Sequence, residues 1–469
     1  MFPLEHALLC GPQMLSWTEG GKAAAAPRTL GLDAAAAIVV GEIVGVGIFL
    51  TPAEMTRALG SPFWILMVWL AVGVTVLCGA LCYGELAARY PEAGGGYVYL
   101  REAWGKGVAF LYGWKSLLVM DPGLTAALAA GLGHYAAALV PLGRWGEKGV
   151  AMAAILTLSL LSALGIRVVG GAVRLLTLAK LALLATIIVA GLASAQGAWT
   201  NFQPFYAPRP GSAPLLAGLA GGIVGAFFSF GGFWDVAKIG GEIRDPRRTL
   251  PRALALGVGT ATILYILTSA AFIRLVPIEA AGSGPAFAAQ AGSALFGAEG
   301  ARVFAAIVLI SIAGSLAAVL MTAPRVYYAM AKDGLFPASV GRLHPRFGTP
   351  VRAIALQAAL ACVAVSLATF DAILSYFVFV TVGFVALTVL GLFRLPPPAG
   401  DTFRVPGSPV TPLGFLALLV TIMALFAGGR PRQAALGTAV VALGIPVYRF
   451  LLSPRMRAPR LPRPMEETS

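Results

Sequence analysis

Two short glycine-containing segments are the part of this chain best suited to bind a small ligand. The first lies in the first long apolar stretch and places Gly45 and Gly47 among apolar residues. The second, in a later apolar stretch, reads Phe228, Ser229, Phe230, Gly231 and Gly232. A helix that unwinds inside lipid is costly unless its free N–H and C=O groups line a cavity or meet a ligand. Two such breaks, one in each half of a chain, predict a binding site within a membrane.

The backbone groups freed at these breaks favour a zwitterionic ligand. The N–H groups of Val46, Gly47 and Ile48 would begin a helix, where the partial positive charge attracts a carboxylate. Carbonyls of the second break, with that of Ile43, can accept from an ammonium group. An α-amino acid carries both charges, and the alternative is that the glycines only allow close helix packing. We expect the substrate-binding residues to be Ile43, Gly45, Val46, Gly47, Ile48, Phe228, Ser229, Phe230 and Gly231.

Three ionisable side chains within apolar stretches are candidates for coupling or gating, because such groups are costly in lipid and usually functional. Lys180 lies near the middle of its stretch, and a buried lysine can exchange a proton near neutral pH. The alternative is a lysine that extends to an interface. Glu42 and Asp121 can pair with Lys180, relay a proton or favour a cationic substrate. Their alternative role is a structural hydrogen bond to helix ends.

Two further charged residues lie in the sixth apolar stretch. Asp235 and Lys238 are three residues apart, so they can pair locally as gating or packing residues. We expect Lys115, in the third stretch, to extend to an interface. The chain has no nucleophile–base arrangement, phosphate-binding loop or metal-ligand cluster, so we predict no enzyme activity, no cofactor and no metal.

Composition places these residues in a polytopic membrane protein. The chain has 469 residues, 58% of them hydrophobic and 12% charged, whereas a soluble domain carries about 25% charged residues. The net charge of +14 could indicate nucleic acid, but the basic residues lie mostly in alternate short loops, as the positive-inside rule requires. We expect a plasma (bacterial inner) membrane protein with both termini in the cytoplasm, contacting lipid but no nucleic acid.

Twelve apolar stretches are long enough to cross a bilayer, which takes about 20 helical residues. Their expected limits are 31–57, 62–88, 107–140, 148–166, 171–195, 213–241, 250–276, 300–331, 351–370, 371–393, 409–428 and 433–452. The breaks fall in the first and sixth spans, and four spans follow each, so 31–195 and 213–393 can form two units in opposite orientations. We expect an all-α membrane protein with twelve transmembrane helices, a 5+5 inverted repeat and two added helices in 409–452. Segments 1–30 and 453–469 would be cytoplasmic.

Several motifs in order resemble the amino acid–polyamine–organocation (APC) superfamily, and in particular the L-type and related prokaryotic amino acid permeases. They are Gly45-Val46-Gly47-Ile48-Phe49, Cys82-Tyr83-Gly84-Glu85-Leu86, Phe228-Ser229-Phe230-Gly231-Gly232 with Glu242-Ile243-Arg244-Asp245-Pro246, and Asp333-Gly334-Leu335-Phe336-Pro337. The similarity covers residues 30–452. It implies a leucine-transporter-type fold that works by alternating access.

The resemblance also implies roles for individual residues. Phe228 would act as a gate over the bound substrate. Lys180 matches a family lysine that stands where sodium-coupled relatives bind an ion, so it would brace the first helix and carry the coupled proton. Val46 stands where the family often has Ser, and Glu42 is unusual for its position. Substrate or coupling can therefore differ from the usual pattern.

We therefore expect a secondary active transporter that moves amino acids, with proton-coupled uptake as the first choice of mechanism. Amino acid exchange without proton coupling is the alternative within the same class. A non-transporting amino acid sensor and a channel are the alternatives outside it. The partners expected are an amino acid, a proton and the bilayer. The outer loops carry no Cys for a covalent partner, and the sequence leaves an accessory subunit undetermined.

Overall fold

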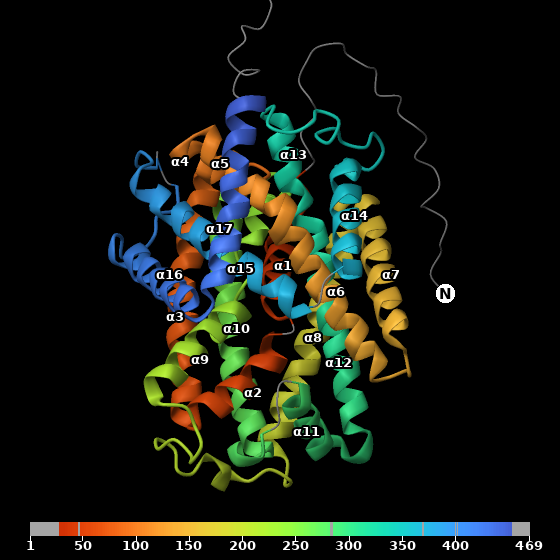
Figure 1. Cartoon of the computed structure of the whole chain (residues 1–469), viewed down its shortest axis with the longest axis vertical. Helices are drawn as coiled ribbons and strands as arrows, with labels where there is room; N and C mark the ends of the chain where they lie inside the picture. Colours follow the sequence, from red (N-terminus) through yellow and green to blue (C-terminus); the bar gives the residue numbers. More distant parts are fainter. Residues whose placement is uncertain are drawn as a thin grey trace, which may run out of the picture.

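The computed structural model describes residues 28–45, 47–281, 285–367, 370–398, 400 and 402–452, which form a bundle of α-helices (Figure 1). Within these residues there is no strand, and extended backbone pairs only at two isolated bridges, Leu30 with Ile243 and Ala93 with Ile239. One end of the bundle carries α13 (Pro324–Lys332) and the other carries α11 (Pro285–Phe296). These are called the α13 end and the α11 end below.

Most of the helices coincide with apolar runs of the sequence. Four of them have a proline in the first turn, where the missing N–H breaks no helical hydrogen bond: Pro62, Pro246, Pro324 and Pro431. The remaining α-helices are α1 (Leu32–Ile43), α2 (Gly47–Leu59), α3 (Pro62–Arg89), α4 (Gly96–Trp104), α5 (Lys106–Lys115), α6 (Asp121–Ala137), α7 (Arg144–Ala163), α8 (Ile166–Ala193), α9 (Leu215–Ser229), α10 (Pro246–Leu275), α12 (Gly300–Thr322), α14 (Val351–Leu367), α15 (Phe370–Leu390), α16 (Val410–Gly429) and α17 (Pro431–Pro446).

Most of the expected spans correspond to long apolar helices. The described part of the chain has eight helices that are long and apolar enough to cross a membrane, or nine if α1 and α2 are one bent span. Shorter apolar helices at Leu215–Ser229, Val351–Leu367 and Phe379–Phe393 lie in the sixth, ninth and tenth expected spans. Since Leu215–Ser229 and Val351–Leu367 are each shorter than the about 20 residues that cross a bilayer, the twelve-helix layout stays a prediction.

The first expected break separates α1 from α2, whose axes differ by 43°. A Cβ atom at Gly47 would lie 2.8 Å from the Oγ of Ser229, and one at Gly45 would lie 3.3 Å from the Oγ of Ser315. Glycine at these positions therefore lets the end of α9 and the middle of α12 approach the break. Val46 lies outside the described residues.

The second break ends α9 at Ser229. Two single 3-10 turns follow, η3 (Asp235–Lys238) and η4 (Gly240–Glu242), before α10 begins at Pro246. Gly232 has a φ of +99°, which an L-residue with a side chain rarely adopts. A Cβ at Gly232 would also lie 3.0 Å from the Cβ of Glu42. This glycine therefore brings the two broken helices into contact.

Helices at corresponding places in the two expected units pack against each other. The pairs α3 with α10, α6 with α12, α7 with α14 and α2 with α9 are all in contact. Two units related by a pseudo-two-fold axis would pair their helices in this way. The packing therefore agrees with the inverted repeat, whose boundaries stay a prediction.

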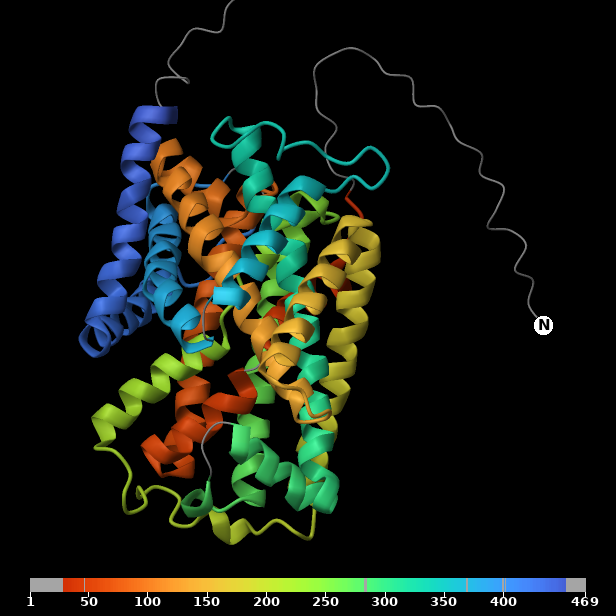
Figure 2. The ribbon, with the colours of Figure 1, turned by 45° about the vertical axis from the view of Figure 1, so that its right-hand side comes forward.

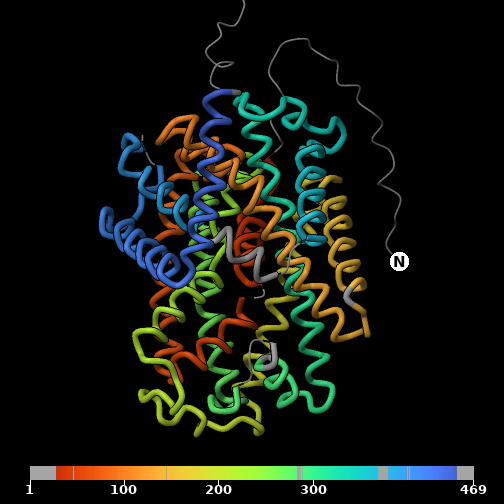
Figure 3. Tube along the Cα trace, in the orientation of Figure 1, coloured from red at the N-terminus to blue at the C-terminus, as the bar shows by residue number. Residues whose placement is uncertain are grey.

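The first broken helix lies at the centre of the bundle. Figure 3 shows the red trace of α1 inside it, and α1 contacts α8, α10 and α12. In Figure 2 the dark-blue helix α17 lies on the outside of the bundle, beside α5 and α15. The last two helices therefore add to the periphery and leave the centre to the broken helices.

Candidate substrate-binding site

A cavity of about 710 Å³ lies between the two helix breaks. Six of the predicted binding residues line it, namely Ile43, Gly45, Gly47, Phe228, Ser229 and Gly231. The cavity extends along α2 to Glu54, which is exposed. Small-molecule sites commonly occupy about 300–1,000 Å³. The space is therefore large enough for an amino acid and reaches toward the α11 end.

Two predicted binding residues lie behind the wall of this cavity. The side chains of Ile48 and Phe230 are fully buried. The ring of Phe230 packs against Tyr265 and Trp69, with centroids 5.1 Å and 6.2 Å apart. Phe228 lines the cavity and is half-buried, a position that leaves its gating role open as a prediction.

The hydroxyl of Tyr265 on α10 joins the two breaks. It lies 2.8 Å from the carbonyl oxygen of Ile43 and 2.6 Å from that of Ser229. The hydroxyl carries one hydrogen, so it donates to one carbonyl at a time. Each carbonyl oxygen has two lone pairs and can accept a second bond. Both carbonyls therefore keep acceptor capacity for an ammonium group while Tyr265 holds them close together.

A second hydroxyl contact joins the helices that continue from the breaks. The Oγ1 of Thr51 on α2 lies 2.8 Å from the Oγ of Ser229 on α9, and both side chains line the cavity. Between them, Tyr265 and Thr51 fix the two broken helices relative to each other. The cavity wall is therefore held by hydrogen bonds as well as by apolar packing.

Lys180 lies on α8 and extends toward the end of α1, between α8 and α12. It is 1% exposed. Its Nζ donates to the carbonyls of Gly41 at 2.9 Å and Val44 at 2.7 Å, and to the Oγ of Ser315 at 3.1 Å. These carbonyls end the first half-helix, where the helix dipole favours a positive charge. The lysine therefore contacts the break directly. The alternative, a Lys180 side chain that extends to an interface, is not the arrangement seen.

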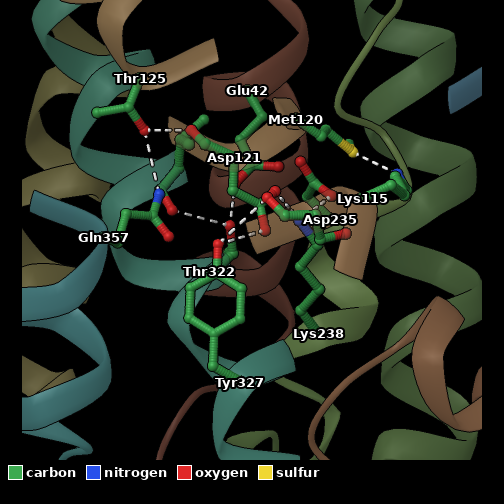
Figure 4. A network of polar contacts seen from close by, with 12 residues as sticks. Glu42, Lys115, Met120, Asp121, Thr125, Asp235, Lys238, Thr322, Tyr327 and Gln357 are labelled. Atoms are coloured by element: carbon green, nitrogen blue, oxygen red, sulfur yellow. Dashed lines mark hydrogen bonds and ion pairs between the residues drawn. The ribbon is translucent and has the colours of Figure 1, made fainter. Parts of the chain in front are cut away.

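The other side of the break carries four buried charged residues, Glu42, Asp121, Asp235 and Lys238, which we call the floor cluster (Figure 4). The Nζ of Lys238 lies 3.1 Å from Asp121 and 2.9 Å from Asp235. Glu42 and Asp235 line the cavity at the end away from exposed Glu54. The predicted local pair is therefore present, and Asp121 joins it from α6.

Hydroxyl groups from α12 and α13 complete the floor cluster (Figure 4). Thr322 donates to Oε1 of Glu42 at 2.9 Å, and Tyr327 donates to Oδ2 of Asp121 at 3.1 Å. Glu42 and Lys180 lie on different sides of α1, and no ion pair joins them within the described residues. A Glu42–Lys180 pair, one of the roles considered for Glu42, is therefore not the arrangement seen.

The expectation that Lys115 extends to an interface is wrong. Its side chain is 2% exposed, and its Nζ lies 4.6 Å from the ring centroid of Tyr112. The Nζ is also 2.7 Å from the sulfur of Met120. Aromatic and thioether groups therefore hold this ammonium, and in the described part of the chain it forms no ion pair with an acid.

Ion pairs close the α13 end beneath the floor cluster. Arg325 pairs with Glu242 at 2.9 Å, and both side chains are buried. Arg101 on α4 pairs with Asp333 at 2.9 Å, and Tyr97 donates to the same carboxylate at 2.8 Å. Burial and this carboxylate raise the pKa of Tyr97, so its hydroxyl stays a donor at neutral pH.

An α-helical membrane protein with a cavity between two broken helices is typical of secondary transporters. The family model described as "Amino acid permease" matches residues 30–448, and the chain belongs to this family. The chain is 29% identical over 430 residues to the serine/threonine exchanger SteT of Bacillus subtilis (strain 168), covering 90% of this chain and 96% of SteT.

Two mammalian relatives are similar over most of their length. The large neutral amino acids transporter small subunit 2 of Homo sapiens is 28% identical over 439 residues, covering 92% of this chain and 81% of that protein. The b(0,+)-type amino acid transporter 1 of Oryctolagus cuniculus is 30% identical over 378 residues, covering 78% and 75% respectively. The expected resemblance to the APC superfamily is confirmed.

Proposed function

We propose that this chain is a secondary active transporter that moves amino acids across the plasma membrane by alternating access. The single observation that carries the proposal is the cavity between the breaks. It places the start of α2 at Gly47 and the carbonyls of Ile43 and Ser229 around one space. The helix start favours the α-carboxylate, and the carbonyls favour the α-ammonium. The proposed binding residues are the six predicted residues that line the cavity, and Tyr265 is added as the residue that holds the two carbonyls close together.

Charge supports an assignment of the α13 end to the cytoplasm. This end carries the loop with Arg244, Arg247 and Arg248 and the segment around Arg342, Arg346 and Arg352. Short cytoplasmic loops carry the excess of Lys and Arg. The cavity reaches toward the opposite end, and ion pairs close the α13 end. With the α13 end assigned to the cytoplasm, we propose that substrate enters this cavity from outside.

Proton-coupled uptake is our first choice of coupling, and Lys180 supports it. Lys180 binds the carbonyls of Gly41 and Val44 most strongly as an ammonium, which has three donors and a positive charge, whereas the neutral amine has two donors and no charge. A proton that leaves Lys180 would weaken these bonds and free the first half-helix to move. Substrate exchange without proton coupling is the second candidate, and the similarity to a serine/threonine exchanger favours it.

Purified protein in proteoliposomes separates these candidates. We expect uptake of a labelled neutral amino acid to rise when the inside is made alkaline, and the Lys180→Ala variant to lose that dependence. The exposed residue Lys106 supplies a matched control, since Lys106→Ala removes a charge away from the break. Counterflow that ignores the pH gradient in the unmodified protein would favour exchange. Binding without counterflow would favour a sensor.

A further inference from the structure

One buried carboxylate oxygen at the floor of the cavity has no partner in the described part of the chain. Thr322 donates to Oε1 of Glu42, whereas Oε2 of Glu42 has no hydrogen-bond partner among the residues that the structure describes. The Glu42 side chain lines the cavity and is 7% exposed. An unsatisfied buried charged group is more costly than an unsatisfied neutral one. This oxygen therefore points to a ligand that enters the cavity.

A second carboxylate lines the same floor and can share its cation. Oδ1 of Asp235 lies 2.9 Å from the Nζ of Lys238, at ion-pair distance but without hydrogen-bond geometry. Lys238 also bonds Asp121 at 3.1 Å. If a ligand engages Asp235, Lys238 therefore stays paired with Asp121. Asp235 can turn to a ligand without leaving a buried ammonium alone, which would be costly.

The other buried lysines are held elsewhere. The three donors of Lys180 bond two carbonyls and a hydroxyl on the far side of α1. Lys115 lies over the ring of Tyr112. The floor cluster therefore has three carboxylates and one ammonium, an excess of acceptors in a place sheltered from solvent.

We infer that the floor cluster is a subsite for a second cationic group on the substrate, the side-chain ammonium or guanidinium of a basic amino acid. Oε2 of Glu42 and the carboxylate of Asp235 hold this group, and the α-amino and α-carboxyl groups bind at the breaks. The inference rests on the proposed function, since it places the same substrate in the same cavity. It adds the chemistry of the side chain.

An organic cation fits this floor better than a metal ion. In the part of the chain that the structure describes, no group of three or more His, Cys, Asp or Glu residues could hold a metal ion. Ammonium and guanidinium groups carry only donors and match carboxylate oxygens that lack them. A neutral side chain would leave Oε2 of Glu42 unsatisfied. The subsite therefore discriminates by charge.

Isosteric pairs of amino acids test this inference. Arginine and citrulline, and lysine and 2-aminoheptanoic acid, have side chains of equal length and differ chiefly in charge. We measure how each inhibits counterflow of a labelled amino acid in proteoliposomes. A charge-assisted hydrogen bond is worth about 1.5–3 kcal/mol, so we expect the citrulline-to-arginine ratio of inhibition constants to be about tenfold or more. We expect Glu42→Gln to lower that ratio about tenfold and Glu42→Asp to lower it less.

Two further variants separate the floor from general charge effects. Glu54→Gln removes a carboxylate at the exposed mouth of the same cavity. Glu299→Gln removes a surface carboxylate that pairs with Arg302. We expect both to keep the wild-type ratio. A wild-type ratio near one, no change in Glu42→Gln, or an equal loss in Glu54→Gln would overturn the subsite. If sodium inhibits the unmodified protein but not Glu42→Gln, and the protein does not discriminate between charged and neutral side chains, the floor cluster binds an inorganic cation and the proposed subsite is refuted.

Ligand-induced thermal stabilisation separates this inference from the proposed function. Purified protein in detergent is heated with arginine or citrulline, and a ligand bound to the folded state raises its melting temperature. Stabilisation by arginine over citrulline without any counterflow would keep the subsite and refute transport. Counterflow of neutral amino acids with equal stabilisation by both ligands would keep transport and refute the subsite. This readout needs no turnover, and Glu42→Asp serves if Glu42→Gln does not fold.

Discussion

Replacing Lys238 by Met tests whether this ammonium neutralises the floor cluster. Its Nζ lies 3.1 Å from Asp121 and 2.9 Å from Asp235, and all three side chains are 1% exposed. Met keeps most of the length of the side chain but removes the charge. Two buried carboxylates then lose their cation, and breaking a buried pair by removing one partner costs about 3–5 kcal/mol. We expect Lys238→Met to lower the free energy of unfolding by about this amount.

The Asp235→Asn variant separates the two ion pairs. It removes one carboxylate and leaves Lys238 paired with Asp121, so we expect a smaller loss of about 1–2 kcal/mol. The double variant Lys238→Met/Asp235→Asn leaves only Asp121 without a cation, and Tyr327 still donates to it. We therefore expect the double variant to be more stable than Lys238→Met alone, a non-additivity that marks residues in contact.

Native thiols report the unfolding. The side chain of Cys82 is fully buried, so it reacts with a maleimide dye only after the fold opens in detergent under increasing temperature or denaturant. Lys106→Met, at an exposed lysine, is the control and should change stability by less than about 0.5 kcal/mol. Two results would refute the reasoning. One is wild-type stability in Lys238→Met, and the other is a double variant no more stable than Lys238→Met.

Three further predictions concern the breaks and the outer surface. Gly47→Ala should reduce transport at least about tenfold, because its Cβ would lie 2.8 Å from Ser229 Oγ and force the breaks apart; initial uptake rates check this. Tyr265→Phe removes one hydrogen bond and should cost about 1 kcal/mol in substrate affinity, measured by competition. The third prediction concerns Glu279 in the outer loop. Hydrogen bonds from the backbone N–H of Glu279 itself and from Arg209 lower the pKa of this carboxyl group. The ionised Glu279 therefore stabilises the folded state slightly at any pH above its pKa in the unfolded chain, about 4.5. This stabilisation is lost as the pH falls further, through the lower pKa that Glu279 has in the folded state. Glu279→Gln should therefore flatten the acid side of a plot of melting temperature against pH.

The glycine breaks could be predicted from the sequence because their signal is local. Glycines inside an apolar stretch at Gly45 and Gly231 conflict with an uninterrupted helix, and lipid makes that conflict costly. Tyr265 and Thr322 could not be found in this way. Tyr265 binds the carbonyl of Ile43, 222 positions away, and Thr322 binds Glu42, 280 positions away. A hydroxyl side chain in an apolar helix more often donates to a carbonyl of its own helix. The presence of a Tyr or Thr in the sequence therefore does not reveal a hydrogen-bond partner on a distant helix.

The error on Lys115 has a different physical origin. Its contacts are local, since Tyr112 precedes it by one helical turn and Met120 follows closely. A lysine beside an aromatic ring at i−3 can satisfy its charge by a cation–π contact without reaching water. The sequence therefore contained a signal against snorkelling. The depth of the residue alone did not decide between the two outcomes.

The contacts of α1 differ in kind on its two sides, and this difference predicts how it moves. Tyr265 joins α1, α9 and α10 into one unit around the breaks. Toward α8 and α12, α1 is held by hydrogen bonds from one ammonium and nearby hydroxyls, which can exchange partners. We therefore expect α1 to move with α10 and against α8 during alternating access.

Two disulfides in a cysteine-free background test that expectation. A Cβ at Gly257 on α10 would lie 2.7 Å from the Cβ of Val39, and a Cβ at Gly41 would lie 2.7 Å from the Oγ1 of Thr177 on α8. Both pairs are therefore near enough to cross-link after small shifts. We expect the Val39→Cys/Gly257→Cys bond to leave counterflow active, because both residues belong to one moving unit. The Gly41→Cys/Thr177→Cys bond should stop counterflow until a reductant restores it, and the reverse pattern would show that α1 moves with α8.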